Sequence, residues 1–324
     1  MKRIVFAAAI AVLTIVVMTP VNPALAGSEA ENNQQKAVLV TGASSGIGLK
    51  ITRVLAANGY FVYAGARKQK DLDALNAMEN VQSLRLDVTK QDEINAAVAT
   101  VKKGGKGLYA LVNNAGVFIG GPLIEVDLEE FKWLMDVNVY GPYRMTQAFA
   151  PMIIEQKGRI TTVGSIAGIL SGQFSGQYSM SKHAIEAYTD SLATEMERFD
   201  VKVSVIEPGN YKSKIALSAG ARMIGKDYVK EGSSYAEEVK GMQERMSDRG
   251  QYKEPDEVAE AAMHALFDPT PKRRYMVVPN QEEASWSVGK AMQEMVQLNE
   301  GQAYSYSRDQ LIEMLDATMN PKTE

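Results

Sequence analysis

The sequence predicts an α/β protein built as a doubly wound parallel sheet with helices on both faces. Two observations support this prediction. Short apolar runs alternate with amphipathic stretches from Lys36 to Pro279, and the first apolar run leads directly into the glycine-rich turn TGASSGIG. Strands that alternate with helices of about ten or more residues are typical of parallel sheets joined by right-handed crossovers.

The individual elements follow from the same alternation. Runs rich in β-branched and aromatic residues, bounded by turn residues, are expected to be strands. These runs are KAVLV (36–40), GYFVYAGA (59–66), VQSLRLDV (81–88), GLYALVNNAG (107–116), RITTVGS (159–165), VKVSVIEPG (201–209) and RRYMVVP (273–279). Helices are expected after the glycine turn and at residues 71–78, 93–101, 127–154, 177–199 and 255–267.

After Pro208-Gly209 the regular alternation stops. Residues 210–253 have mixed polarity and no clear period, so we expect an irregular lid that serves function rather than a simple connection. Its apolar residues could contact a lipophilic ligand, or they could pack the lid onto the domain. They are Ile215, Leu217, Met223, Ile224, Tyr228 and Val229.

The chain is expected to contain one globular domain, residues 36–280, that includes this lid. A carboxy-terminal extension, 281–324, follows and contains the amphipathic stretch DQLIEMLDATM. The sequence leaves the role of this extension open.

The amino terminus predicts export. A basic start, MKR, precedes the apolar run IVFAAAIAVLTIVVM and a small-x-small site that ends at Ala26, which is the pattern of a secretory signal peptide. We therefore expect residues 1–26 to be cleaved, residues 27–35 to form a polar tether, and the domain to lie in the periplasm or another extracytoplasmic space. The alternative is an uncleaved anchor, for which the apolar run is short.

Composition excludes several chemistries. The chain has no cysteine and two histidines, so disulfides, a thiol nucleophile and a Cys/His zinc site are not available. Net charge is −4 with a pI near 5.5, and no long basic run occurs, which argues against nucleic acid as a partner. His183 and His264 are interpreted as surface or packing residues. Redox chemistry would have to rest on an organic cofactor.

The turn TGASSGIG has the features of a dinucleotide-binding loop in a Rossmann-type sheet. It lies between a strand and an amphipathic helix, the setting in which a glycine motif is informative. Gly42 permits the tight turn, Gly46 lets the backbone approach a pyrophosphate, and Gly48 permits close helix packing. The amino terminus of the helix adds N–H donors and a positive dipole.

The end of the second predicted strand indicates which dinucleotide is bound. An acid at this position would bind the ribose of NAD, whereas an arginine suits the 2′-phosphate of NADP. FVYAGARK offers Arg67 and Lys68 and no acid. We therefore expect NADP, with NAD as the alternative cofactor. Arg67 and Lys68 could also be a solvated basic pair that contacts no nucleotide.

Several further motifs, in order, resemble the short-chain dehydrogenase/reductase family over about Val38–Pro279. Asp87 in LDVT resembles the residue that meets the adenine, NNAG at 113–116 the floor of the cofactor site, and Pro208-Gly209 the turn beside the nicotinamide. Ser213 stands where the family more often has threonine. The cofactor contacts that the resemblance implies are Gly42, Ser44, Ser45, Gly46, Ile47, Gly48, Arg67, Asp87, Val88, Asn114, Ala115, Gly116, Tyr178, Lys182, Pro208, Gly209 and Ser213.

The resemblance also implies a catalytic tetrad. Asn138 in DVNVYG, Ser165 in VGSIAG, and Tyr178 with Lys182 in YSMSK match its four positions. Finer similarity, in LYALVNNAGV and DSLATEMERFDVKVSVIEPGN, points to the retinol, hydroxysteroid and 3-hydroxybutyrate dehydrogenases. Taken singly, each tetrad residue could be structural, as a helix, turn or core residue.

Tyr178 and Lys182 lie one helical turn apart, and this spacing suits an acid/base catalyst. A free phenol has a pKa of about 10, and a nearby ammonium stabilises its anion. In oxidation Tyr178 would take the alcohol proton, and in reduction it would donate one. The resemblance implies that Lys182 also holds the nicotinamide ribose, that Ser165 binds the substrate oxygen, and that Asn138 holds a water in the proton relay.

The function expected from these features is oxidoreduction of a small molecule, a secondary alcohol or ketone of lipophilic character. The alternative is a nucleotide-binding sensor or scaffold on the same fold, without turnover. The resemblance further implies a homodimer or homotetramer paired through the helices at 127–154 and 177–199. A membrane would be a partner only if residues 1–26 remain as an anchor. NADP is a cytoplasmic cofactor, which conflicts with export and leaves three alternatives: the protein carries its cofactor out, residues 1–26 are an anchor, or the export prediction is wrong.

If the export prediction holds, native protein begins at Gly27. Cleavage after Ala26 follows from the basic start, the apolar run and the small-x-small site. Amino-terminal sequencing of native material, together with cell fractionation, checks this prediction. Recovery of residue 1 or 2 contradicts cleavage, and co-fractionation with cytoplasmic markers contradicts export.

Overall fold

The computed structural model describes residues 35–225, 228–248 and 250–320. The predicted signal peptide and residues 27–34 of the tether lie outside these described residues. Residues Gln35–Glu324 form one compact unit. Among the described helices, none has the length and apolar character needed to cross a membrane.

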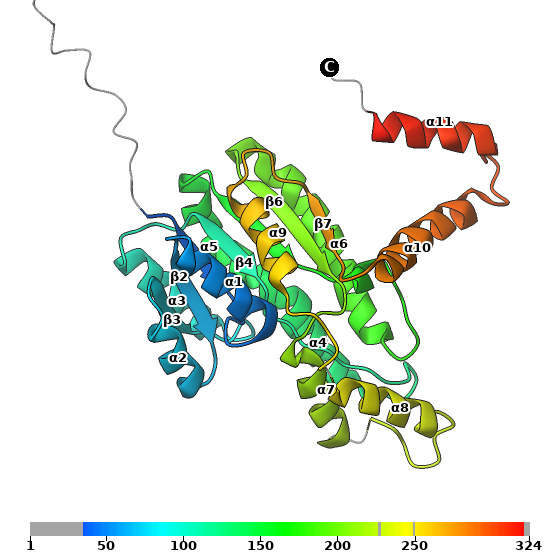
Figure 1. The fold of residues 1–324 in the computed structure, drawn as a ribbon, viewed down its shortest axis with the longest axis horizontal. Helices are drawn as coiled ribbons and strands as arrows, with labels where there is room; N and C mark the ends of the chain where they lie inside the picture. The colour runs from blue at the N-terminus through cyan, green and yellow to red at the C-terminus, as the bar shows by residue number, and fades with distance from the viewer. Residues whose placement is uncertain (1–34, 226–227, 249, 321–324) are drawn as a thin grey trace, which may run out of the picture. The chain divides into compact units, whose positions relative to one another are not determined.

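A seven-stranded sheet organises this unit, in the order β3-β2-β1-β4-β5-β6-β7 (Figure 1). Every strand pairing is parallel. The strands are β1 (Ala37–Val40), β2 (Phe61–Ala66), β3 (Val81–Arg85), β4 (Ala110–Asn113), β5 (Arg159–Val163), β6 (Lys202–Pro208) and β7 (Arg274–Val277). The sequence prediction of a doubly wound parallel sheet is therefore confirmed.

Two apolar layers cover the sheet because successive strand residues point to opposite faces. In β1, Val38 and Val40 join the cluster beneath α1 (Gly46–Ala57), α2 (Gln69–Asn76) and α9 (Asp256–Phe267). Leu39 joins the other cluster, beneath α3 (Gln91–Lys103), α5 (Gly141–Glu155) and α6 (Gly176–Met196). Strands buried on both faces explain why the predicted strands read as continuous apolar runs.

The helix expected at 127–154 is interrupted. It consists of α4 (Leu128–Met135), a π-helical turn over Asp136–Tyr140, and α5. Such single π turns occur frequently at functional sites. The apolar pattern of the sequence predicts one continuous helix here and does not reveal the turn.

The lid is not irregular, contrary to our expectation. It contains α7 (Lys214–Gly225) and α8 (Ala236–Ser247), which bury Met223, Val239 and Met246 against the α4 region. Glycine and charged residues inside both helices hide the apolar periodicity, so tertiary packing stabilises helices that local propensity does not predict.

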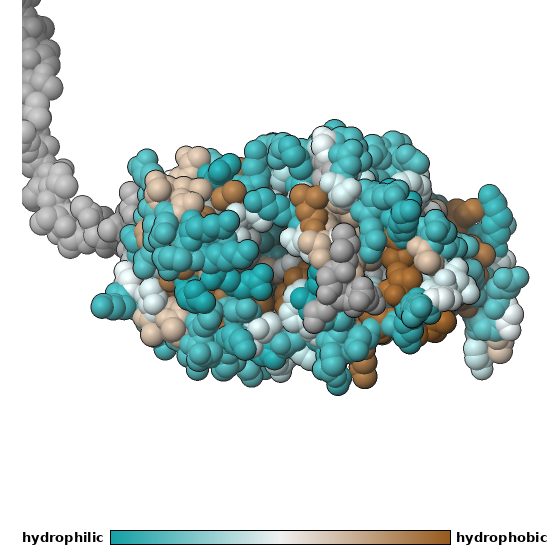
Figure 2. All heavy atoms as spheres, turned by 90° about the horizontal axis from the view of Figure 1, so that it is seen from below, coloured by the Kyte–Doolittle hydropathy of each residue, from teal (hydrophilic) through white to brown (hydrophobic). Residues whose placement is uncertain are grey.

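The carboxy-terminal extension contains α10 (Gln281–Asn299), which the sequence analysis missed, and α11 (Arg308–Met319), which matches the predicted amphipathic stretch. None of the described α11 residues is buried. Several of the largest exposed apolar side chains belong to these two helices, among them Leu298 and Met319. The face seen in Figure 2 is mainly hydrophilic, with separate apolar patches.

Candidate active site

A cavity of about 630 Å³ opens at the carboxyl ends of the strands, where β1 and β4 diverge. This divergence is the switch point at which open α/β sheets bind their ligands. The cavity is lined by every site residue predicted from the sequence except Asn138, from Gly42 in the glycine turn to Ser213 at the start of the lid. Motifs far apart in the chain thus share one chamber.

The glycine turn has the geometry of a phosphate cradle. Gly42 and Gly46 have φ values of 64° and 55°, in the left-handed region that favours glycine. A Cβ on Gly48 would lie 2.3 Å from Asn114 Nδ2, so α1 packs closer to the NNAG segment than any side chain would allow. Within the described chain, the Ser45 side chain makes no capping hydrogen bond to α1. These features fit a pyrophosphate at the helix amino terminus.

The predicted selectivity residue, Arg67, follows β2 directly. Its side chain is 59% exposed, and its Nη1 lies 3.7 Å from Asp87 Oδ2. Asp87 accepts hydrogen bonds from the backbone N–H and the hydroxyl of Thr89, at 3.0 and 2.8 Å. Burial opposes ionisation of Asp87, but the Thr89 hydrogen bonds and the charges of Arg67 and Lys90 outweigh it and lower its pKa. The Arg67–Asp87 contact is long and exposed, so it leaves the guanidinium accessible.

Ser165, Tyr178 and Lys182 converge at one end of the cavity. Ser165 follows β5, while Tyr178 and Lys182 lie in the first two turns of α6. The hydroxyls of Tyr178 and Ser165 are hydrogen-bonded. Lys182 Nζ donates to the carbonyl of Val163 at 2.9 Å and lies 5.6 Å from the centroid of the Tyr178 ring. The spacing read from the sequence places the phenol and the ammonium together on α6, and the segment after β5 brings the Ser165 alcohol to them.

The electrostatics of this end differ from the expectation that Lys182 lowers the pKa of Tyr178. Burial raises the pKa of Tyr178 to about 12, against a smaller lowering by the Ser165 hydrogen bond. Burial also lowers the pKa of Lys182 to about 8, against the opposing charge of Glu186. In this arrangement the low polarity of the site outweighs the attraction between phenolate and ammonium.

Asn138 lies in the π turn and does not line the cavity as the described residues define it. Its side chain accepts from the backbone N–H of Val117 at 2.8 Å and donates to the Val117 carbonyl at 2.9 Å and to Ser181 Oγ at 3.0 Å. These contacts tie the π turn to the segment after β4 and to α6. These contacts are those of the structural role that the sequence analysis gave as the alternative to holding a water.

Of the apolar lid residues singled out in the sequence, Ile215 lines the cavity. Met223, Tyr228 and Val229 pack within the lid cluster, and Leu217 is exposed, while the Ile224 side chain lies outside the described structure. For three of the five residues whose side chains are described, the packing alternative is correct. The lid surface toward the cavity is made instead by Ala216, Ala219, Met242 and Met246.

Two further contributors to the cavity were not found from the sequence. Trp286 of α10 lines it, as does Trp133 of α4, and these are the two tryptophans of the chain. Glu283, in the first turn of α10, is 4% exposed and accepts a hydrogen bond from the backbone N–H of Asn210 at 2.8 Å. A Cβ on Gly209 would lie 2.2 Å from Glu283 Oε2. The carboxy-terminal extension thus holds the turn Pro208-Gly209-Asn210 in place. The local sequence around this turn does not predict the contact.

The two histidines take no part in the cavity that the described residues form. His183 is exposed, with its Nδ1 2.8 Å from the Ser179 carbonyl. His264 Nδ1 lies 2.8 Å from the Tyr275 hydroxyl and its Nε2 lies 3.3 Å from Asp268. Both positions agree with the surface or packing role assigned from the sequence.

Comparisons with known proteins agree with this geometry. The family model of the short chain dehydrogenases matches residues 36–223. Mouse mitochondrial D-beta-hydroxybutyrate dehydrogenase is 32% identical over 76% of this chain and 78% of its own length. Rat retinol dehydrogenase 16 is 32% identical over 75% of this chain and 80% of its own. A solved structure, the closed form of serine dehydrogenase complexed with NADP⁺, is 27% identical with a TM-score of 0.64, covering 74% and 94% of the two chains.

The fold and the site define a nicotinamide-dependent oxidoreductase that acts on CH–OH groups. The chain belongs to the short-chain dehydrogenase family. Its residues fit the cofactor, because the glycine turn leaves a cradle that a Cβ at Gly46 or Gly48 would narrow. The glycine turn, NNAG and Pro208-Gly209 would hold the dinucleotide.

Glu283→Ala is expected to weaken nucleotide binding several-fold. The change leaves the Asn210 N–H without its acceptor and opens space beside Gly209, so the turn next to the nicotinamide site loses its support. Nucleotide titration by tryptophan fluorescence measures the effect. Glu282→Ala, at the exposed neighbouring position, is the control. Equal affinity in both variants would show that α10 does not support the site.

Proposed function

We propose that this protein is an NADP-dependent oxidoreductase that interconverts a lipophilic secondary alcohol and its ketone, with Tyr178 as the acid/base. One observation carries the proposal: a single cavity joins the glycine cradle and Arg67 to the Ser165–Tyr178–Lys182 group and to an apolar lid surface. A sensor without turnover would not need a phenol, an alcohol and a buried ammonium in contact at the end of its nucleotide site.

The proposed roles follow from donors and acceptors. A bound nicotinamide would supply or take up the hydride at the carbinol carbon. Ser165 donates a hydrogen bond to the substrate oxygen and stabilises charge that develops on it. Tyr178 donates its proton to that oxygen in reduction and accepts it in oxidation. Lys182, as a cation beside the phenol, favours the tyrosinate form, and its own pKa of about 8 keeps it charged at neutral pH.

The lining of the cavity supports a lipophilic substrate. Phe118 lies with its ring centroid 4.9 Å from that of Tyr178, and Leu170, Met242 and Trp286 add further apolar surface. Two lid cations, Lys214 and Arg222, line the cavity, and Glu130 pairs with Arg222 through two hydrogen bonds, at 2.5 and 2.9 Å. This neutralised guanidinium is poorly suited to bind the carboxylate of a small hydroxy acid. Retinol dehydrogenase 16, named above, also has a lipophilic alcohol in its name.

Arg67 is proposed to select NADP over NAD. A guanidinium can make charge-assisted, bidentate contacts to the 2′-phosphate, and NAD has no such group. Arg67→Asp is expected to weaken NADP binding by about tenfold or more and to favour NAD in relative terms. Titration of both nucleotides against both proteins measures the ratio.

The control for this substitution is Arg85→Asp, at the end of the adjacent strand β3. Arg85 is exposed to a similar extent, 61%, and its Nε lies 3.7 Å from Glu93, but it does not line the cavity that the described residues form. The same change in the nucleotide ratio for both variants would indicate a general charge effect and contradict the assignment.

Tyr178→Phe is expected to reduce turnover by about 10²–10⁴-fold while nucleotide binding stays nearly intact, because the proton-transfer group is lost and the ring remains. Reduction of a panel of lipophilic ketones with NADPH, with acetoacetate as the small anionic member, provides the assay. A preference for acetoacetate would overturn the lipophilic assignment.

Tyr188→Phe is the matched control on the same helix. Its hydroxyl donates to Thr146 Oγ1 at 2.7 Å, and burial also raises its pKa to about 12. Loss of this hydroxyl should cost on the order of 1 kcal/mol of stability and leave turnover near normal. Near-normal turnover in Tyr178→Phe would remove the proposed acid/base and with it this mechanism.

A further inference from the structure

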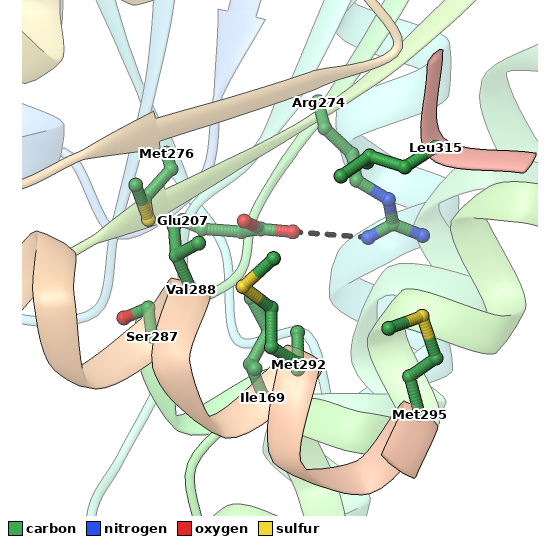
Figure 3. Close-up of a pocket in the computed structure, with 10 residues that line it drawn as sticks. Ile169, Glu207, Arg274, Met276, Ser287, Val288, Met292, Met295 and Leu315 are labelled. Carbon is green, nitrogen blue, oxygen red and sulfur yellow. Dashed lines mark hydrogen bonds and ion pairs between the residues drawn. The ribbon is translucent and has the colours of Figure 1, made fainter. Parts of the chain in front are cut away.

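Behind the catalytic group, Arg274 of the edge strand β7 contacts three carboxylates from two other elements. Its Nη1 donates to Glu207 Oε1 of β6 at 2.9 Å and to Glu186 of α6, and its Nη2 donates to Asp190 of α6 at 2.5 Å. Figure 3 shows the Arg274–Glu207 contact in a cavity of about 490 Å³ that α10 lines with Val288 and Met292. The cluster therefore lies outside the catalytic cavity but borders it.

Two of these carboxyls are deeply buried. Glu207 is 2% exposed and Glu186 is 8% exposed, whereas Asp190 and Arg274 reach solvent. One guanidinium thus serves two buried acids, and Glu186 Oε1 has no hydrogen-bond partner among the described residues. Buried, incompletely paired carboxyls are costly, so their presence calls for a specific explanation.

The position of Glu186 connects the cluster to the catalytic residues. It lies one helical turn after Lys182, on the same face of α6. Its carboxyl also fills the space beside the two glycines near Ser165: a Cβ would lie 2.9 Å from Glu186 Oε1 at Gly164 and 2.8 Å at Gly168. Glu207 immediately precedes Pro208-Gly209. The cluster thus borders all three backbone segments that carry Ser165, Lys182 and the nicotinamide turn.

We propose that Glu186, held in place by Arg274, is a positioning residue of the active site that fixes the loop of Ser165 and keeps the proton on Lys182. This inference rests on the proposed function, since it concerns the state of Lys182 during catalysis. In this role the buried acids Glu186 and Glu207 support the active site without taking part in the proton transfer itself.

Electrostatics support the second part of this role. The charged groups that face Glu186 are Lys182 and Asp190 on its own helix, Glu207 on β6 and Arg274 on β7. Burial and repulsion from Glu207 raise the pKa of Glu186 to about 8, against the lowering by Arg274. Burial lowers the pKa of Lys182 to about 8, and the charge of Glu186 opposes that lowering.

These two groups consequently titrate in the same pH range. As the pH rises, Glu186 loses its proton and becomes a carboxylate in the pH range in which Lys182 would otherwise lose its own. The new negative charge on Glu186 favours the charged form of Lys182, so the lysine keeps its proton. Interacting groups of this kind share macroscopic pKa values. The pair extends the alkaline range over which Lys182 remains a cation beside Tyr178.

Glu186→Gln tests the proposal, because glutamine keeps the shape and removes the charge. The alkaline limb of kcat/KM for ketone reduction should move to lower pH by on the order of one unit, the effect of losing one nearby opposite charge. At a pH above the limb, kcat/KM should then fall about tenfold relative to the unmodified enzyme. Lowered activity at every pH with an unmoved limb would show a packing role only and overturn the proposal, as would an unchanged profile.

Arg274→Lys gives a second test should Glu186→Gln fail to fold. One ammonium cannot bridge both carboxyls, so Glu186 should stay protonated to higher pH and the limb should move in the same direction. An unmoved limb in this variant also overturns the proposal. Arg273→Met is the matched control: Arg273 pairs at 3.1 Å with exposed Glu197, away from the cluster, and its loss should change nothing.

Tyr178→Phe, measured in parallel, distinguishes failure of the proposed function from failure of the role proposed for Glu186. If Tyr178→Phe is inactive and the limb of Glu186→Gln does not move, the proposed function stands and the role of Glu186 falls. If Tyr178→Phe turns over normally, the proposed function itself has failed.

Discussion

The hydrogen bonds that join the end of β1 to the end of β4 are the constraint on which the glycine turn and the cavity beside it depend. Thr41 Oγ1 accepts the backbone N–H groups of Asn114 and Ala115, both at 2.9 Å, and Asn114 Nδ2 donates to the Thr41 carbonyl at 2.8 Å. These bonds lock the glycine turn to the NNAG segment where the two strands diverge. The contact is so close that Gly48 has no room for a side chain, and the amino terminus of α1 is aimed at the cavity as a result.

A different constraint, the burial of charge, acts around Lys182 and Tyr178. Lys182 is 6% exposed and is held by the Val163 carbonyl and by the field of Glu186. Glu186 is in turn held by Arg274, which reaches it from the edge strand. A low-polarity site strengthens every such interaction and penalises every unpaired charge. The Lys182 ammonium is therefore one member of a charge network that spans α6, β6 and β7.

The carboxy-terminal extension contributes to the site, as the glycine turn near the start of the domain does. α10 follows the last strand, and its first turns supply Glu283 to the turn at Gly209 and Trp286 to the wall of the cavity. The lid contributes through packing: Tyr228 and Arg222 both bond to Glu130 of α4, which fastens the lid to the body of the domain. Segments outside the regular alternation of strands and helices thus help to shape the cavity.

The sequence by itself determined the parallel sheet, the glycine turn at Gly42–Gly48 and the spacing of Tyr178 and Lys182, because each depends on residues close together in the chain. It also indicated a family whose membership the comparisons confirm. It did not reveal the π turn that carries Asn138, the helices of the lid, or α10.

Only the tertiary structure decided which distant groups meet. Glu186 and Arg274 are 88 residues apart, Asn210 and Glu283 are 73 apart, and Glu130 and Arg222 are 92 apart. Periodicity and turn chemistry report local preference, whereas these pairs form where separate elements pack together: α6 against β7, the turn after β6 against α10, and α4 against the lid helix α7.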